Sequence, residues 1–261
     1  MSTIFYQIVI PFFLSAFVVI LITMIAERYG TKVGGILGTL PSTIVIAFLF
    51  IAINENEQFA ANAAAVVPAE LGINIIFLFI FALIVHRSTI LAFTGTFAMW
   101  SILSYLLVFY NMDDITLSVL IYLVALVICF FILEKQKGIP SVGTVRIHYT
   151  PVKIMLRGVL AGSVIAIAVV LSSVGSIISG IFSVFPAILS STMLISVREH
   201  GPDFAAGMAK SMMIGLSSVA TYAVFIHFLY PTIGIAFGTF LSYVFAFSVT
   251  MLIFVLRKKI T

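Results

Sequence analysis

Nine long apolar runs, separated by short polar stretches, constrain this chain more than any other feature of its sequence. Each run is about 20 to 27 residues long, and a helix of about 20 apolar residues crosses the hydrocarbon layer of a membrane. The predicted spans are 4–26, 33–53, 59–85, 89–110, 115–133, 152–171, 177–197, 204–229 and 233–256. We therefore expect an all-α integral membrane protein with nine transmembrane helices, located in the cell membrane.

The scarcity of charge favours the same fold class. Only 8% of the 261 residues are charged and 62% are hydrophobic, whereas a soluble domain has about 25% charged residues. This composition excludes a soluble enzyme, a nucleic-acid-binding protein and a disordered scaffold. The lipid bilayer is the expected surrounding, and a homo-oligomer is possible within it.

The distribution of basic residues predicts the orientation of the spans. All 13 lysines and arginines fall at the odd-numbered connections and the C-terminal tail, and cytoplasmic connections are enriched in these residues. They are Arg28, Lys32, Arg87, Lys135, Lys137, Arg146, Lys153, Arg157, Arg198, Lys210, Arg257, Lys258 and Lys259. The opposite connections contain acidic residues or no charge. The expected topology is N-outside and C-inside.

An internal similarity predicts that the two halves of the chain are related. Residues 30–71 align without gaps with residues 175–216 at a constant offset of 145, and both segments contain a Gly-x4-Gly-x5-Pro pattern. The offset pairs spans one to four with spans six to nine and leaves span five as a linker. Because the step from one span to its paired span is five helices, an odd number, the halves have opposite orientations. We expect a four-helix repeat at 1–111, a linker helix and cytoplasmic loop at 112–151, and a second, inverted repeat at 152–261.

Two prolines at matching positions predict interrupted helices near the middle of the membrane. Pro41 and Pro186 each lie about ten residues from one end of a span, roughly 15 Å along a helix, and proline breaks the helical hydrogen-bond ladder. Hydroxyl side chains follow each proline, namely Ser42, Thr43, Ser190, Ser191 and Thr192. Freed carbonyls and hydroxyls suit a cation, whereas the N-termini of half-helices suit an anion. A simple kink for packing is the other interpretation.

Two ionisable residues lie inside predicted spans. An ionisable side chain at membrane depth is costly and is a functional candidate. We expect Glu70 to be a proton or cation site and Lys210 to be its partner or an anion contact, because simple counting gives them similar depths. Lys210 reaching the inner headgroups, or a static structural pair, are the alternatives. Polar neighbours on the same two spans are Asn62, Asn74, Ser217 and Thr221.

The segment 175–230 resembles the small four-helix GlpM-like membrane proteins. The resemblance rests on Ser-Gly-Ile-Phe-Ser-Val-Phe-Pro at 179–186, on Arg-Glu-His-Gly at 198–201, and on the small-residue helix that follows. It covers about one repeat, and residues 30–85 match the same outline. The resemblance implies that this chain is a fused pair of such units, and it implies no substrate.

Inverted repeats are typical of secondary transporters, with sites near the midplane where the repeats meet. The sequence therefore predicts a small secondary transporter that moves a small solute or ion by alternating access, with proton or cation coupling. A passive channel, a lipid flippase or scramblase, and a non-catalytic membrane subunit are the alternatives. No nucleotide-binding or familiar hydrolase motif is present, so we expect no enzymatic activity, no catalytic residue, no cofactor and no metal site.

Overall fold

The computed structural model describes the backbone of residues 5–38, 41–139 and 150–260, and the side chains of 7–24, 41–139 and 150–255. Every regular element in these ranges is a helix. The elements are η1 (Phe5–Val9), α2 (Ile10–Gly38), α3 (Ser42–Asn54), α4 (Glu57–Ile84), α5 (Thr89–Phe109), α6 (Ile115–Phe131), η2 (Ile132–Gln136), α7 (Pro151–Val170), η3 (Leu171–Ser173), α8 (Ser176–Ser183) and α9 (Ala187–Ile260).

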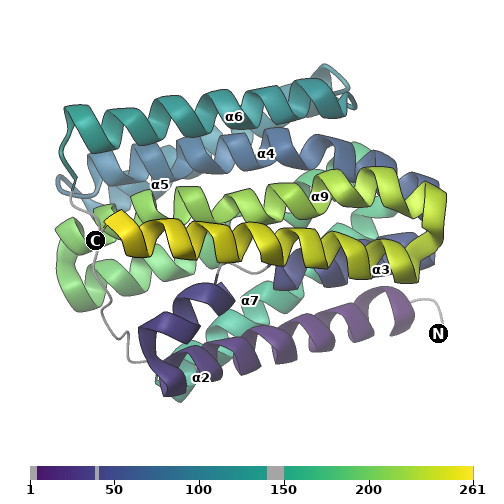
Figure 1. The fold of residues 1–261 in the computed structure, drawn as a ribbon, viewed down its shortest axis with the longest axis horizontal. Helices are drawn as coiled ribbons and strands as arrows, with labels where there is room; N and C mark the ends of the chain where they lie inside the picture. Colours follow the sequence, from purple (N-terminus) through teal and green to yellow (C-terminus); the bar gives the residue numbers. More distant parts are fainter. Residues whose placement is uncertain (1–4, 39–40, 140–149, 261) are drawn as a thin grey trace.

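The described residues contain six helices that are long and apolar enough to cross a membrane, together with the shorter apolar helix α3. This agrees with a membrane-embedded, all-helical protein. The number six differs from the nine predicted spans for two reasons: α9, which covers the region of predicted spans seven to nine, is counted as one helix of 74 residues, and α3, in the region of span two, has only 13 residues. The backbone is non-helical at Gly201 and Gly234 inside it, and Figure 1 shows the chain reversing direction within α9.

These two glycines explain how α9 turns. Gly201 has φ 86° and Gly234 has φ 78°, a left-handed conformation that glycine adopts without steric cost. Gly201 is followed directly by Pro202, and Gly234 lies three residues after Pro231. Gly201 lies in the predicted connection between spans seven and eight, whereas Gly234 lies just inside the predicted start of span nine. No break occurs at the predicted connection between spans one and two, because α2 is helical from Ile10 to Gly38.

The predicted interruptions at both prolines are confirmed. Helix α2 ends at Gly38 and α3 begins at Ser42, with Pro41 as its N-cap residue and residues 39 and 40 outside the described ranges. Helix α8 ends at Ser183 and α9 begins at Ala187, so the backbone at 184–186 is not helical. Proline has no N–H and its ring clashes with the preceding turn, which accounts for a helix starting directly after each one.

Helix α4 forms the centre of the bundle. It packs against α5, α6, α8 and α9, and 72% of the residues in its most apolar stretch are buried. Close approach depends on small residues: a Cβ atom on Gly72 would lie 3.3 Å from the Cα atom of Tyr122 in α6. The other long helices expose many large apolar side chains, including Phe13, Phe109 and Phe237, as expected for surfaces in lipid.

Two pairs of helices run antiparallel. In the first pair, Gly158 of α7 faces Ala16 and Gly162 faces Phe12 of α2, so the numbering rises in one helix as it falls in the other. In the second pair, Nδ1 of His227 lies 2.8 Å from the carbonyl oxygen of Ala61. At the other end of these helices, Nε2 of His86 lies 2.7 Å from Oδ1 of Asp203. These contacts fix the register of α4 against α9.

Candidate functional site

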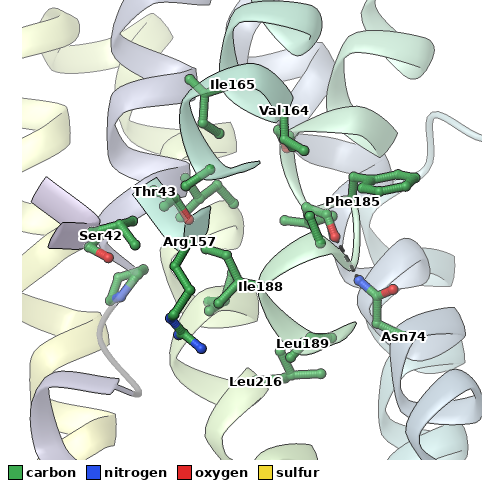
Figure 2. A pocket seen from close by; sticks show the side chains of 18 of the residues that line it. Ser42, Thr43, Asn74, Arg157, Val164, Ile165, Phe185, Ile188, Leu189 and Leu216 are labelled. Carbon is green, nitrogen blue, oxygen red and sulfur yellow. Dashed lines mark hydrogen bonds between the residues drawn. The ribbon is translucent and has the colours of Figure 1, made fainter. Parts of the chain in front are cut away.

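A cavity of about 170 Å³ lies where the two interrupted helices meet. Side chains from α2, α3, α4, α7 and both sides of the 184–186 break line it (Figure 2). Non-helical backbone at membrane depth is tolerated where it is buried in protein or lines a cavity. The location of the cavity therefore fits the sequence-based expectation that the broken stretches near Pro41 and Pro186 form a site.

The first turns of two helices line this cavity. Ser42, Thr43 and Ile44 are the first residues of α3, and Ala187, Ile188 and Leu189 are the first residues of α9. The first amide groups of an α-helix have no acceptor within the helix, and the helix dipole gives that end a partial positive charge. No side chain caps the start of α3. The positive dipole ends of both helices thus lie beside the same space, and the first amide of α9, that of Ala187, donates to the carbonyl oxygen of Phe185.

Arg157 adds a full positive charge to the cavity wall. It belongs to α7, and its Nη1 atom donates a hydrogen bond of 2.7 Å to Oγ1 of Thr192. The sequence analysis counted Arg157 as an orienting charge of the cytoplasmic loop and missed it as a site residue. Its position in the sequence could have indicated a buried charge. Arg157 lies six residues after the start of the helix, roughly 9 Å along it, and directly follows the apolar residues Met155 and Leu156.

Asn74 of α4 supplies the most buried polar group in the wall. Its side chain is 1% exposed, and its Nδ2 atom donates a hydrogen bond of 2.8 Å to the carbonyl oxygen of Val184 (Figure 2). This bond satisfies one carbonyl in the interrupted stretch between α8 and α9. The Oδ1 atom of Asn74 accepts no hydrogen bond from the described residues. Buried acceptors of this kind are ordinarily hydrogen-bonded to protein or to ordered water.

The electrostatic character of the site follows from its lining. Among the described residues that line the cavity, Arg157 is charged and none is a carboxylate. The remaining polar side chains there are neutral: Thr23, Ser42, Thr43, Asn74 and Ser183. The two helix starts add to the positive charge.

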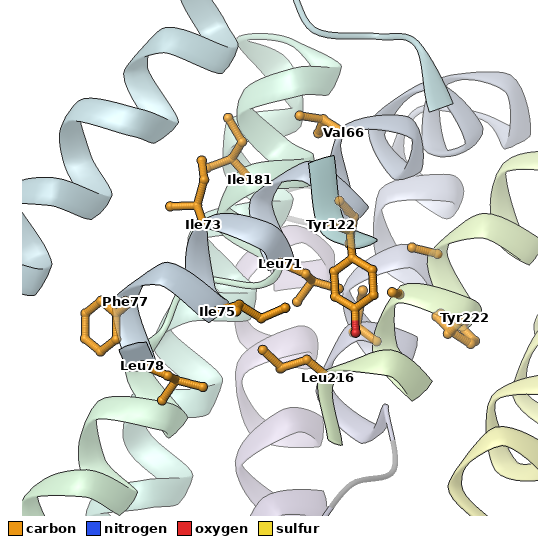
Figure 3. Close-up of a cluster of buried hydrophobic side chains, with 14 of the residues drawn as sticks. Val66, Leu71, Ile73, Ile75, Phe77, Leu78, Tyr122, Ile181, Leu216 and Tyr222 are labelled. Atoms are coloured by element: carbon orange, nitrogen blue, oxygen red, sulfur yellow. The ribbon is translucent and has the colours of Figure 1, made fainter. Parts of the chain in front are cut away.

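Residues at the 145-residue offset face the cavity in pairs. The pairs are Val19 with Val164, Ser42 with Ala187, Thr43 with Ile188, Ile44 with Leu189, Leu71 with Leu216, and Asn74 with Val219. Leu71 and Leu216 also belong to the buried cluster around α4 (Figure 3). The cavity is thus bounded by matching positions of two similar segments.

Glu70 lies outside the cavity, one helical turn before Asn74. It is completely buried, and the Oγ atom of Ser104 in α5 lies 3.0 Å from both of its carboxylate oxygens. No ion pair of the described residues includes Glu70. Trp100, one turn earlier on α5, packs edge-on against Phe185 at a ring separation of 4.9 Å. Phe185 lines the cavity, so α5 connects the surroundings of Glu70 to the cavity wall.

The expected contact between Glu70 and Lys210 is not formed. Lys210 is 1% exposed, and its Nζ atom donates to Oε2 of Glu134 at 2.7 Å and to the carbonyl oxygen of Ile139. The register of α4 and α9 places Lys210 about nine residues from Glu70, roughly 13 Å along the axis. The prediction counted the depth of Glu70 from one end of its span. Because α4 is 28 residues long, Glu70 lies farther from the other end of the helix than that count assumed. Lys210 is held inside the protein and does not reach outwards.

The remaining predicted residues fall into two groups. Pro41, Ser42 and Thr43 line the cavity, and Pro186 directly precedes the first turn of α9. The others have local hydrogen bonds. Asn62 is exposed and accepts from Gln58, and Ser217 is bonded to Tyr122. Four hydroxyl groups donate to backbone carbonyls of the preceding turn, namely those of Ser190, Ser191, Thr192 and Thr221. Thr192 also accepts the hydrogen bond from Arg157.

The described residues contain no group of three or more His, Cys, Asp or Glu side chains that could hold a metal ion. Comparison of the chain with protein-family models, with curated proteins and with solved structures found no match.

Proposed function

We propose that this protein is a small secondary transporter that moves a small solute across the cell membrane by alternating access. The observation that carries this proposal is the cavity between α3 and α9, which is lined in pairs by residues 145 positions apart. Secondary transporters bind substrate at such a junction, on discontinuous helices near the midplane. The solute-binding residues are those of the cavity wall.

An inverted repeat supplies the physical route. In this proposal, residues 1–111 and 152–261 are the two halves, residues 112–151 link them, and nine spans run from outside to inside. The antiparallel packing of α2 with α7, and of α4 with the middle of α9, supports this arrangement. Each half can adopt the conformation of the other, and the exchange opens the cavity to the opposite side. The GlpM-like resemblance agrees with paired four-helix units and stays a prediction.

We assign the coupling proton to Glu70. An ionised carboxylate without a cationic partner is very costly in a buried site, and uptake of a proton removes that cost. Ser104 holds the carboxyl group through its hydroxyl, and Asn74 follows one turn later on the same helix. A change in the charge of Glu70 therefore acts on the wall of the cavity through α4 and through the packing of α5.

The test measures access to the cavity from each side of the membrane. The single cysteine, Cys129, is first replaced in Cys129→Ala, and Thr43→Cys or Ile188→Cys is then introduced at two paired cavity positions. A charged, membrane-impermeant thiol reagent is added to right-side-out or inside-out vesicles. Alternating access predicts that each cysteine is modified from both sides and that the vesicles conduct no steady ion current.

Phe237→Cys provides the matched control. Its side chain is 72% exposed on the apolar surface of α9, so lipid should protect it from a charged reagent on both sides. Modification of the cavity cysteines from one side alone contradicts alternating access. A steady ion current indicates a channel. Modification of Phe237→Cys by the charged reagent indicates an aqueous path exposed to lipid, as in a scramblase. Cavity cysteines that never react indicate a structural subunit.

A further inference from the structure

We propose that a groove between α6 and α9 binds an anionic phospholipid, with an acyl chain along the groove and the phosphate group at Lys135. This inference does not depend on the proposed transport function, because it requires only that α6 lies in a lipid bilayer. Three properties of the groove support it: its apolar lining, its length and the charge at one end.

The lining of the groove is apolar along most of its length. Helix α6 forms one edge of the bundle (Figure 1), and the groove, of about 390 Å³, lies where α6 meets α9. Its apolar lining residues are Leu126, Val127, Phe130, Phe131 and Ile214. Val127 and Phe131 are 66% and 54% exposed, so the described part of the chain leaves the groove open to an acyl chain of the surrounding bilayer.

The length of the groove matches one leaflet of a bilayer. Leu126 and Lys135 are nine residues apart, roughly 14 Å along a helix axis, and half of the hydrocarbon layer is about 15 Å thick. Lys135 lies at the end of the apolar segment Ile115–Gln136, the depth at which headgroups begin. An apolar cavity of about 150 Å³ holds benzene, so the groove has room for roughly 15 carbon atoms, about one acyl chain.

The charge at the end of the groove selects an anionic headgroup. Lys135 lines the groove and is exposed, and no ion pair of the described residues includes it. Glu134 also lines the groove, but its Oε2 atom accepts a hydrogen bond of 2.7 Å from Nζ of the buried Lys210. The carboxylate is thus matched from within the protein, and Lys135 is left to face the headgroup. Basic residues at a membrane surface attract anionic lipids, and the exposed Lys137 adds to the positive charge there.

Quenching of tryptophan fluorescence by brominated lipids tests this inference in reconstituted bilayers. The single tryptophan of the chain is first replaced in Trp100→Phe, and Phe131→Trp then places the reporter in the groove. The probes are phosphatidylglycerol and phosphatidylcholine, each brominated along its acyl chains. One lysine near the membrane surface contributes a roughly fivefold preference for an anionic lipid. We therefore expect phosphatidylglycerol to bind at the reporter roughly fivefold more tightly than phosphatidylcholine.

Substitutions assign the preference to one charge. Lys135→Gln should abolish the preference for phosphatidylglycerol, and Lys135→Arg should retain it because the charge is kept. Arg198→Gln is the matched control: it removes a positive charge from an exposed position of α9 outside the groove, and it should leave the preference unchanged. A reporter at Phe237→Trp, a position 72% exposed on the apolar surface of α9, should bind the two lipids about equally. Because Lys135 is exposed, thermal unfolding of Lys135→Gln should match that of the parent protein.

Four results overturn the inference. Equal binding of the two lipids at the groove excludes selection by charge, and a preference that survives Lys135→Gln excludes Lys135 as its source. An equal preference at Phe237→Trp shows a general effect of the charged surface instead of a site. If neither lipid quenches the reporter at residue 131, protein covers the groove, as in contact with a second copy of the chain. A preference lost in Lys135→Gln and kept in Arg198→Gln upholds the site.

Discussion

Substitution of Gly180 by alanine tests the packing that positions one wall of the cavity. A Cβ atom at this position would lie 2.1 Å from the carbonyl oxygen of Ala63 and 2.6 Å from Cγ1 of Val66. Because the closer atom belongs to the backbone of α4, no side-chain rotation relieves the clash. Helix α8 must move away from α4 by about 1 Å, and the break that follows α8 must move with it.

The magnitude follows from two opposing terms. Overpacking a tight contact costs typically 1–3 kcal/mol, and a backbone clash belongs at the upper end, about 3 kcal/mol. Alanine in place of glycine gains about 1 kcal/mol in a helix. The expected net loss is therefore about 2 kcal/mol of unfolding free energy. For a protein of this size, this corresponds to a fall in Tm of roughly 4–8 °C.

Thermal unfolding of the detergent-purified protein measures this effect. Trp100 provides the signal, since its ring packs against Phe182 of α8 at a centroid distance of 6.3 Å. Gly95→Ala is the matched control: a Cβ atom there meets nothing within 4 Å, so it should raise the stability by about 1 kcal/mol. A Gly180→Ala protein as stable as the original, or one stabilised as much as Gly95→Ala, refutes the close contact between α8 and α4.

Three further substitutions test other parts of the structure. Asp114→Ala removes the side chain that accepts the first amide donors of α6, and it should cost about 1 kcal/mol in thermal unfolding, whereas Asp114→Asn should be nearly neutral. Glu134→Gln leaves Lys210 buried without its carboxylate partner and should lower the unfolding free energy by roughly 2 kcal/mol. This is less than for a fully buried pair because the side chain of Glu134 is 43% exposed. If the double variant Lys210→Met, Glu134→Gln loses as much stability, the unpaired lysine is not the cause. Glu70→Gln keeps a group that accepts from Ser104, so the protein should remain folded. In the Thr43→Cys background, modification of the cavity cysteine in vesicles should lose its dependence on an imposed pH gradient, and unchanged dependence would remove Glu70 from coupling.

The backbone features of the site were accessible from the sequence because their causes are local. A proline lacks the N–H that the helical ladder needs and clashes with the preceding turn, and Pro41 and Pro186 both directly precede a new helix, whereas α4 continues through Pro68. Gly234 illustrates the same point, since its turn lies within four residues of Pro231. The apolar runs likewise predicted the helices, because the hydrocarbon layer requires each segment to satisfy its own backbone hydrogen bonds.

The partners of the charged groups depended on the tertiary structure. Sequence spacing suggested that Glu70 and Lys210 meet, but the register of α4 against α9 separates them, and Glu134 from the linker binds Lys210 instead. From the sequence, Arg157 was assigned to the cytoplasmic charges. The packing of α7 against α2 and α9 places it in the wall of the cavity. The apolar runs thus predicted helices and the prolines predicted the breaks before α3 and α9, but the predicted break between spans one and two is absent. The partners of the side chains follow from the register and rotation of packed helices. Both are set by packing between residues far apart in the chain, which no local pattern records.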